Sequence, residues 1–298
     1  MTILVTGATG NVGGHVVRTL AARGVPVRAF VRDRDRAASL FGPDVELAVG
    51  DLADRASIDR ALAGADRVFL ACGNVPGQVE FECTAIDAAA AAGVARVVKL
   101  SGPDASVDSP LIFERWHGEI ERHLAGSGLP AVLLRPRTYL TNLLAYAGSV
   151  AQTGMLFAPA GTAEISFVDT RDVAEAAVSA LTGTGHDGRT YTLTGPQAVT
   201  FEEVAAALSA AAARPVTYVA VDDEQARQAM LAEGLPPMIV DAIVAIFASQ
   251  RTGTMADTTD TVRDLTGRPP RTVADFARDH AAAFRPTGVV DSGLVTGR

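Results

Sequence analysis

Short apolar runs alternate with longer amphipathic segments through the first half of the chain. The runs are rich in Val, Ile and Phe and carry few polar residues, as expected of parallel strands that are covered on both faces. We predict strands at Ile3–Thr6, Val27–Val31, Val45–Val49, Arg67–Ala71, Val97–Ser101 and Ala131–Arg135. We predict helices between them at Val12–Arg23, Arg36–Phe41, Ser57–Ala63, Val79–Ala92 and Glu114–Ser127. This alternation indicates βαβ units and an α/β fold with a doubly wound parallel sheet.

The pattern changes after Pro136, where loops and shorter elements follow. Alternation of strand and helix returns at Ile165–Leu181 and Thr190–Thr194. Thr200-Phe-Glu-Glu203 has the spacing of a capping box and predicts a helix that runs to Ala211. Pro236-Pro237 predicts the start of another helix. This second half is expected to form a smaller lobe beside the sheet.

The composition is that of a folded globular protein, because 48% of the 298 residues are hydrophobic and 20% are charged. The net charge is −8 and the arginines are dispersed, so we expect no nucleic-acid partner. The apolar stretch Ile239–Ala248 is too short for a bilayer and contains Asp241, so we expect a packed helix and no membrane partner.

The N-terminal residues lack the basic and apolar regions of a secretion signal, and we therefore expect a cytoplasmic protein. Cys72 and Cys83 show neither zinc-ligand spacing nor a disulfide framework, so no metal is expected. The sequence leaves monomer and homodimer equally open. Lys99 is the only lysine of the chain, so any mechanism that needs a lysine must use it.

The segment Gly7-Ala-Thr-Gly10-Asn-Val-Gly13 lies directly between the first predicted strand and the first predicted helix. Glycines at these positions permit a tight turn and allow backbone N–H groups to approach a pyrophosphate at the positive end of the helix. The alternative is a glycine-rich turn without a ligand. We predict a dinucleotide-binding loop formed by Gly7, Thr9, Gly10, Asn11, Val12 and Gly13.

The second predicted strand ends at Arg32, where an arginine would accept the 2′-phosphate of NADP and an acidic residue would bind the ribose of NAD. Arg32, with Arg36 as support, favours NADP, while Asp33 keeps NAD possible. The alternative is that Arg32 is an ordinary surface arginine.

Further cofactor contacts are expected where the third and fourth strands end. Gly50-Asp51-Leu52 follows the third strand, and the Asp51 carboxylate either accepts a hydrogen bond from an adenine amino group or caps the next turn. Ala71, Cys72 and Gly73 end the fourth strand and are expected to line the cofactor. We interpret Cys72 as a small packing residue rather than a nucleophile.

Taken together, several segments make the chain resemble the NmrA-like group of atypical short-chain dehydrogenases. They are Gly7-Ala-Thr-Gly-x-x-Gly13, Val-Arg-Ala-Phe-Val-Arg32, Gly50-Asp51-Leu52, Ser127-Gly-Leu129 before a strand that ends Leu134-Arg-Pro136, and Phe167-Val-Asp-x-Arg-Asp-Val173-Ala. The similarity extends to about Phe276. It implies a Rossmann domain that binds NAD(P), a smaller C-terminal substrate lobe and a cleft between them.

On this basis residues 1–298 are expected to form one NmrA-like unit. The Rossmann core would comprise residues 1–135 and 165–195, the substrate lobe residues 136–164 and 196–284, and an irregular tail residues 285–298. Members of the group divide between reductases of quinones, azo compounds and related molecules and sensors that bind the cofactor without turnover.

The Tyr-x-x-x-Lys dyad of active short-chain dehydrogenases is absent, because Phe113-Glu-Arg-Trp-His117 stands at the matching place. His117 occupies the lysine position and is the best candidate for proton transfer, since an imidazole titrates near neutral pH. We expect Glu121, one turn later, to orient His117 or raise its pKa. The alternative is a surface histidine paired with Glu121.

Other side chains are expected in the same cleft. Ser101 and Tyr139 are weaker candidates for catalysis, and Trp116 and Phe113 are expected to border an aromatic substrate. Lys99 is interpreted as a charge at a strand edge near a carboxylate. Arg137, Thr138, Tyr139 and Asn142 are expected on the substrate side, or else their segment is a helix that buries one face. The apolar residues between Met230 and Met255 form either a substrate pocket or an exposed face that binds a protein.

We therefore predict an NAD(P)H-dependent oxidoreductase, with NADP preferred, that reduces a small aromatic or conjugated carbonyl or quinone compound by hydride transfer. Two alternatives remain open. One is a redox sensor that binds NAD(P) without turnover, and the other is a nonredox isomerase or lyase that uses the same cleft.

Overall fold

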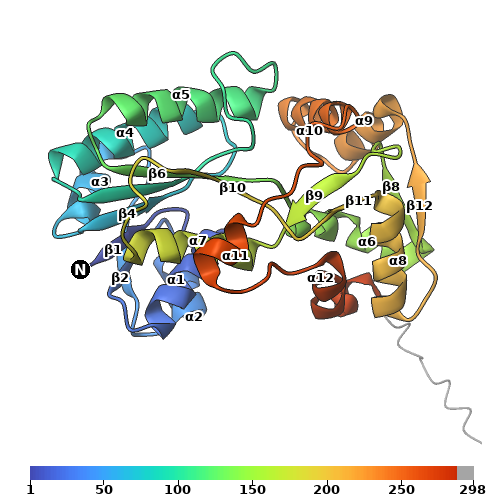
Figure 1. Ribbon diagram of the computed structural model, residues 1–298, viewed down its shortest axis with the longest axis horizontal. Helices are drawn as coiled ribbons and strands as arrows, with labels where there is room; N and C mark the ends of the chain where they lie inside the picture. The colour runs from blue at the N-terminus through green and yellow to red at the C-terminus, as the bar shows by residue number, and fades with distance from the viewer. Residues whose placement is uncertain (287–298) are drawn as a thin grey trace, which may run out of the picture.

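The computed structural model describes residues 1–286, and within this range seven strands form one parallel sheet (Figure 1). The strands are β1 (Ile3–Val5), β2 (Val27–Val31), β3 (Glu46–Val49), β4 (Arg67–Leu70), β5 (Arg96–Leu100), β6 (Ala131–Pro136) and β10 (Thr190–Leu193). Their order is β10-β6-β5-β4-β1-β2-β3. Strands β2 and β3 lie on one side of β1, and the later strands, beginning with β4, lie on the other side. The carboxyl ends of β1 and β4 therefore flank the crevice where ligands of such sheets bind.

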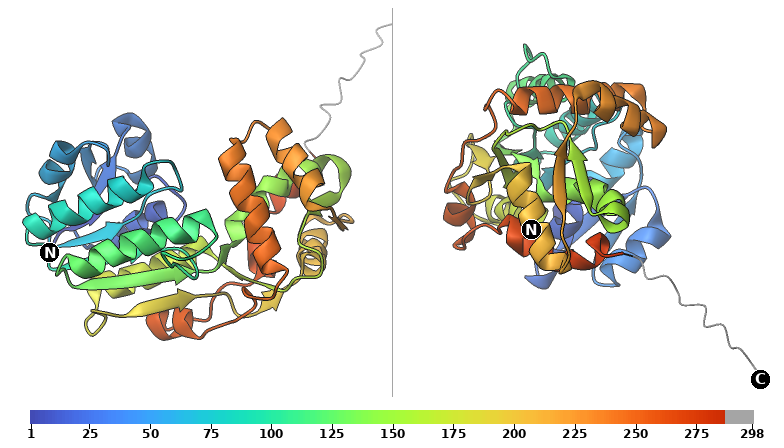
Figure 2. Two further views of the ribbon diagram at one scale, coloured as in Figure 1. Left: turned by 90° about the horizontal axis from the view of Figure 1, so that it is seen from above. Right: turned by 90° about the vertical axis from the view of Figure 1, so that its right-hand side faces the viewer.

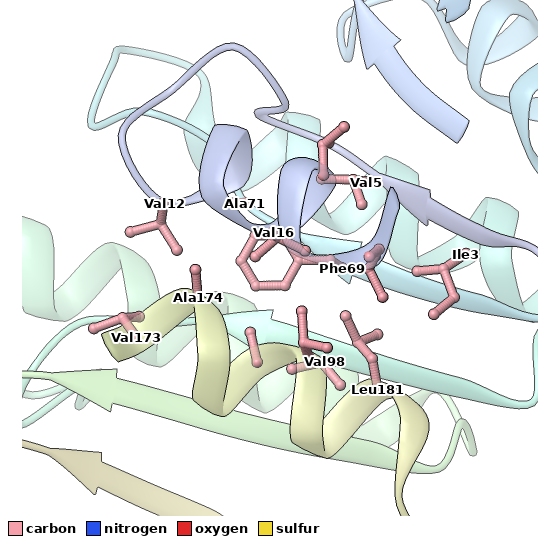
Figure 3. Close-up of a cluster of buried hydrophobic side chains, with 14 of the residues drawn as sticks. Ile3, Val5, Val12, Val16, Phe69, Ala71, Val98, Val173, Ala174 and Leu181 are labelled. Atoms are coloured by element: carbon pink, nitrogen blue, oxygen red, sulfur yellow. The ribbon is translucent and has the colours of Figure 1, made fainter. Parts of the chain in front are cut away.

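Helices cover both faces of this sheet, as Figure 1 shows. One face carries α3 (Arg55–Leu62), α4 (Gln78–Ala91) and α5 (Ile112–Gly126), and the other carries α1 (Gly13–Ala22), α2 (Arg34–Phe41) and α7 (Thr170–Thr182). Because both faces are covered, successive strand residues are buried alternately in two cores. Val5 and Phe69 pack in the core that faces α1 and α7, whereas Leu4 and Leu70 pack in the opposite core. Figure 3 shows the first core, with Phe69 between α1 and α7.

The rest of the described chain forms a smaller lobe beside the sheet (Figure 2). Its elements are β7 (Thr138–Tyr139), η1 (Leu140–Tyr146), α6 (Ala147–Thr153), β8 (Met155–Ala158), β9 (Ile165–Val168), β11 (Ala198–Val199), α8 (Phe201–Ala212), β12 (Thr217–Ala220), α9 (Asp223–Ala232), α10 (Pro237–Gln250), α12 (Val273–Asp279) and η2 (Ala281–Phe284). Strands β11, β9 and β7 form one small sheet within this range, and β12 pairs with β8 in another. A separate core, with Phe167, Phe201 and Phe276 among its members, holds the lobe together. The helix α11 (Thr261–Thr266) returns to the main sheet domain and packs against α7.

The α/β class and the doubly wound parallel sheet are confirmed. The predicted capping box is present, since Thr200 N–H donates to Glu203 and Glu203 N–H donates to the Thr200 hydroxyl. Helix α2 begins earlier than predicted because Asp33 caps it by accepting a hydrogen bond from Arg36 N–H at 3.0 Å. Strand β9 pairs with β7 and β11 instead of joining the main sheet. Most of the predicted irregular tail, residues 287–298, lies outside the described residues.

Candidate active site

A cavity of about 520 Å³ lies where the carboxyl ends of β1, β4 and β5 face the smaller lobe. It brings together thirteen of the residues singled out in the sequence. These are Gly7, Thr9, Gly10, Asn11, Val12, Gly13, Arg32, Ala71, Cys72, Gly73, Ser101, His117 and Tyr139. The glycine loop and the proton-transfer candidates thus share one continuous space.

Backbone packing requires glycine in the loop between β1 and α1. Gly7 has φ +58°, and a Cβ added there would lie 2.9 Å from the Ala71 carbonyl oxygen. A Cβ at Gly13 would lie 2.3 Å from the Gly7 carbonyl oxygen, closer than any real contact. The loop therefore folds tightly against itself and against the end of β4.

The start of α1 leaves room for an anion. Its N-cap, Val12, offers no side-chain acceptor to the first N–H groups of the helix, and its first turn contains no acidic residue. Unsatisfied N–H groups at such an end attract negative charge. Together with the glycine cradle, this environment fits the diphosphate of a dinucleotide.

The hydroxyl of Thr6 fixes β1 to β4 beneath the loop. Thr6 is buried, its Oγ1 accepts a hydrogen bond from Ala71 N–H at 2.8 Å, and it donates to the Ala71 carbonyl at 2.9 Å. Sequence reasoning missed this role, although a polar residue at the end of an otherwise apolar strand was the available signal.

Arg32 lines the cavity at the end of β2, and its side chain is exposed there. Asp33 is engaged in capping α2, so its carboxylate is turned to the helix rather than to a ribose. Asp51 and Leu52 do not line the cavity. The Asp51 carboxylate accepts a hydrogen bond from Ala53 N–H at 3.0 Å, as expected of a residue that caps the next turn.

His117 is buried in α5 with 8% of its surface exposed, and it does not pair with Glu121. Instead Glu121 accepts a hydrogen bond from the Ser101 hydroxyl at 2.6 Å and forms an ion pair with Arg135. The expected pairing was wrong because β6 supplies a guanidinium that binds this carboxylate from the sheet side. Glu121 therefore neither orients His117 nor pairs with it at the surface, and both expectations for Glu121 were wrong.

The Nδ1 atom of His117 lies 3.3 Å from Nζ of Lys99. Burial lowers the pKa of His117 well below its usual value, and the positive charges of Lys99 and Arg135 lower it further. The expectation that a neighbour would raise this pKa was therefore wrong. His117 is a neutral imidazole at pH 7.

Lys99 is fully buried in the middle of the sheet rather than at a strand edge, since β5 lies between β4 and β6. The expected carboxylate is present: Glu82 of α4, also fully buried, lies 2.8 Å from Nζ of Lys99. Gln78 donates a hydrogen bond to Glu82 at 3.0 Å. Burial raises the pKa of Glu82, and Lys99 counteracts part of that rise. Sequence reasoning missed Glu82, although a lysine inside an apolar strand requires a partner of opposite charge.

The remaining candidates differ in their surroundings. Burial raises the pKa of Cys72 to about 11, so this side chain is a thiol and not a nucleophile at neutral pH. Burial also raises the pKa of Tyr139, which keeps its phenol protonated. Phe113 lines the cavity as expected, but Trp116 borders a separate hollow beside Gly77.

The smaller lobe supplies the opposite wall of the cavity. Arg137 is 8% exposed and forms ion pairs with Asp104 at 2.6 Å and Asp257 at 2.7 Å, which tie the loops that carry these two carboxylates to β6 and β7. The other lining residues of this wall are Thr138, Asn142, Ala242, Ile246 and Met255. Ala242, Ile246 and Met255 form the apolar wall of the cavity, beside the polar Thr138 and Asn142.

The sequence profile of the NmrA-like family matches residues 1–269. The chain belongs to the NmrA-like family. This NmrA-like protein is 44% identical over 282 residues to the NAD(P)H azoreductase of Xenophilus azovorans, covering 95% of this chain and 99% of that protein.

Two solved structures are also similar. The NADPH-dependent quinone oxidoreductase QOR2 of Escherichia coli, complexed with NADPH, has a TM-score of 0.85 and 31% identity, covering 93% of this chain and 99% of that one. The Citrobacter sp. triphenylmethane reductase, complexed with NADP(H), has a TM-score of 0.84 and 26% identity, covering 94% and 99%. The resemblance drawn from the sequence motifs is thus confirmed.

Proposed function

We propose that this NmrA-like protein is an NAD(P)H-dependent reductase of small aromatic or conjugated compounds such as quinones. The observation that carries the proposal is the single cavity that joins the glycine loop to His117, Tyr139 and an apolar wall. The similar proteins named above, an azoreductase, a quinone oxidoreductase and a triphenylmethane reductase, support the same reaction class.

The cofactor is NADP, as in the similar structures that contain NADPH or NADP(H). The loop from Gly7 to Gly13 and the start of α1 would hold its diphosphate, and Arg32 would bind the 2′-phosphate. Ala71 and Gly73 would line the cofactor at the end of β4. When bound, the nicotinamide supplies the hydride.

The substrate would lie between Phe113 of α5 and the apolar wall, where Ile246 and Met255 would exclude water from the reacting atoms. Tyr139 and His117 would present hydrogen-bond donors to the oxygen or nitrogen that gains negative charge. A quinone or another conjugated acceptor needs little acid assistance, so the absence of the Tyr-Lys dyad is compatible with turnover.

We also propose that the protein acts in the cytoplasm, on small molecules and without a nucleic-acid partner. Its net charge of −8 and the two free cysteines support this setting. Within residues 1–286, every helix is too short or too polar to span a lipid bilayer. We further propose the division into a Rossmann core and a substrate lobe near the boundaries given above, except that β9 pairs within the lobe and α11 packs against the core. The protein would act as a monomer or a homodimer.

The test begins with titration of the purified protein with NADPH and NADH, followed by a turnover assay with a panel of quinones and azo compounds. We expect tight NADPH binding and continuous oxidation of NADPH with at least one acceptor. Stoichiometric binding without oxidation by any acceptor would refute the reductase and favour a sensor.

The role of Arg32 is tested by Arg32→Ala, with Arg55→Ala as the matched control because Arg55 is exposed on α3 and does not line the cavity. Loss of a charge-assisted hydrogen bond is expected to weaken NADPH binding about 10- to 100-fold. NADH binding should change by less than about 3-fold, since NADH has no 2′-phosphate. Equal losses for the two cofactors would refute the assignment.

A further inference from the structure

We propose that Lys99 and His117 form a proton relay, held by Glu82, that delivers the proton required after hydride transfer. This inference rests on the proposed reductase function and assigns a source for the proton that the missing Tyr-Lys dyad would otherwise supply. His117 lines the cavity, while Lys99 and Glu82 lie behind it in the protein interior.

The relay is built from groups that are costly to bury. Lys99 and Glu82 have no exposed surface, and their charged atoms lie 2.8 Å apart. Removing such a pair from water is unfavourable, and apolar residues of similar size in the same place are often as stable. A buried ion pair directly behind a cavity-lining histidine is therefore better explained by chemistry than by packing.

The identity of the cation matters for this role. An arginine cannot release its proton in a protein, whereas a lysine can. Apart from its histidines, the chain has arginine at every basic position except Lys99. The one cationic side chain that can donate and regain a proton is thus placed in contact with the imidazole.

The hydrogen bond between Lys99 and His117 has a fixed direction. A charged ammonium carries no lone pair, so Nζ donates and Nδ1 of His117 accepts across 3.3 Å. In the neutral ring the proton is then on Nε2. A Cβ added at Gly102 would lie 2.7 Å from Cδ2 and 3.5 Å from Nε2 of His117. The Cδ2–Nε2 edge of the imidazole therefore packs against Gly102, which lines the cavity.

The charges around the ring keep it neutral before reaction. Lys99 approaches from β5 and Arg135 from β6, and both oppose a positive imidazole. On α5, Glu121 is engaged by Arg135 and Ser101, and Glu114 accepts a hydrogen bond from the Ser109 hydroxyl. Glu82 of α4 lies beyond Lys99. Besides Glu114, the charged residues of the cavity wall are Arg32 and Arg137.

The proposed step is balanced as follows. The substrate gains a hydride and its negative oxygen or nitrogen takes the proton from Nε2 of His117. The electron pair of that N–H bond stays on the ring, and Nδ1 takes a proton from Nζ of Lys99, which becomes a neutral amine beside Glu82. After product release, water protonates Nε2 and the proton on Nδ1 returns to Lys99. The net change is one hydride and one proton added to the substrate.

The test uses the full-length double variant Glu82→Gln/Lys99→Met, which removes both charges together and leaves no orphaned ion in the core. NADPH affinity should remain within about 2-fold, while single-turnover reduction of a quinone should slow about 10- to 100-fold. The solvent isotope effect should vary nonlinearly with deuterium fraction in the wild type, because two protons move, and linearly in the double variant.

The matched control is Asp87→Asn. It breaks the ion pair between His123 and Asp87, which also joins α4 to α5 but lies at the surface away from the cavity. Its turnover and isotope effect should equal those of the wild type. Burial is the main cause of the low pKa of His117 and stays in the double variant, so loss of the Lys99 charge should raise that pKa only in part.

Unchanged turnover and a wild-type isotope pattern in the double variant would overturn the relay and leave the reductase intact. Nitrogen NMR of the imidazole gives a readout that does not need activity. The relay requires a neutral ring protonated on Nε2 in the wild type at pH 7, and a ring protonated on Nδ1 or doubly protonated would refute it. Failure of the wild type to oxidise NADPH with any acceptor would instead refute the proposed function.

Discussion

Gly13→Ala is expected to disturb the cofactor loop through the backbone alone. The added Cβ would lie 2.3 Å from the carbonyl oxygen and 2.8 Å from the carbonyl carbon of Gly7, whereas ordinary contact begins at 3.4 Å. Neither atom belongs to a flexible side chain. The start of α1 must therefore move away from the β1 turn by about 1 Å.

The size of the effect follows from that displacement. Overpacking of this kind typically costs about 1–3 kcal/mol. For a chain of this length, about 2 kcal/mol corresponds to a melting temperature lower by roughly 3 °C. A shift of about 1 Å in groups that position reactants can reduce the rate ~100-fold. We expect kcat/KM for NADPH to fall toward that limit.

Gly14→Ala is the matched control, because Gly14 is also buried in the first turn of α1. Its Cβ would lie 3.3 Å from the Ala8 carbonyl oxygen and otherwise near the flexible end of Arg18. The better helix propensity of alanine, about 0.5–1 kcal/mol, should offset that contact and leave stability near the wild-type value. Thermal melts and NADPH titrations measure both variants. Equal behaviour of Gly13→Ala and Gly14→Ala would refute the argument from backbone packing.

Two further outcomes follow from the described contacts. Because burial raises the pKa of Cys72 to about 11, alkylation of its thiol by iodoacetamide should be slow at pH 7.5 and become steadily faster toward pH 11. Comparison with Cys72→Ser separates the alkylation of Cys72 from that of Cys83. Rapid alkylation of Cys72 at neutral pH would contradict the burial argument. Thr200→Ala removes the capping box with Glu203 and should lower the free energy of unfolding by about 1 kcal/mol in a denaturant titration. NADPH affinity should not change, and an unchanged unfolding midpoint would show that the cap contributes nothing.

The parts of the fold that sequence predicted are those set by local chemistry. Apolar runs such as Val68 to Leu70 predicted strands covered on both faces, and the core residues on either side of the sheet confirm that interpretation. The glycine loop could be located because three glycines between a strand and a helix have few structural explanations. Thr200 and Glu203 predicted their helix start because a cap depends on residues three positions apart.

The parts that sequence missed depend on contacts between distant segments. Spacing placed Glu121 beside His117 on one helix, but it could not show that Arg135 of β6 would bind the same carboxylate. In the same way, spacing along the chain could not show that Glu82 of α4 lies beside Lys99 of β5. Trp116 was assigned to the wrong hollow because helical spacing does not determine which face of α5 meets the cavity.

The burial of Lys99 also has a chemical consequence for handling the protein. It is the only side-chain amine in the sequence, and it has no exposed surface. Amine-specific reagents should therefore spare every side chain of the folded protein and modify Lys99 only when the layer between α4 and the sheet opens. The extent of labelling at this one position would count opening events of the interior, without any engineered probe.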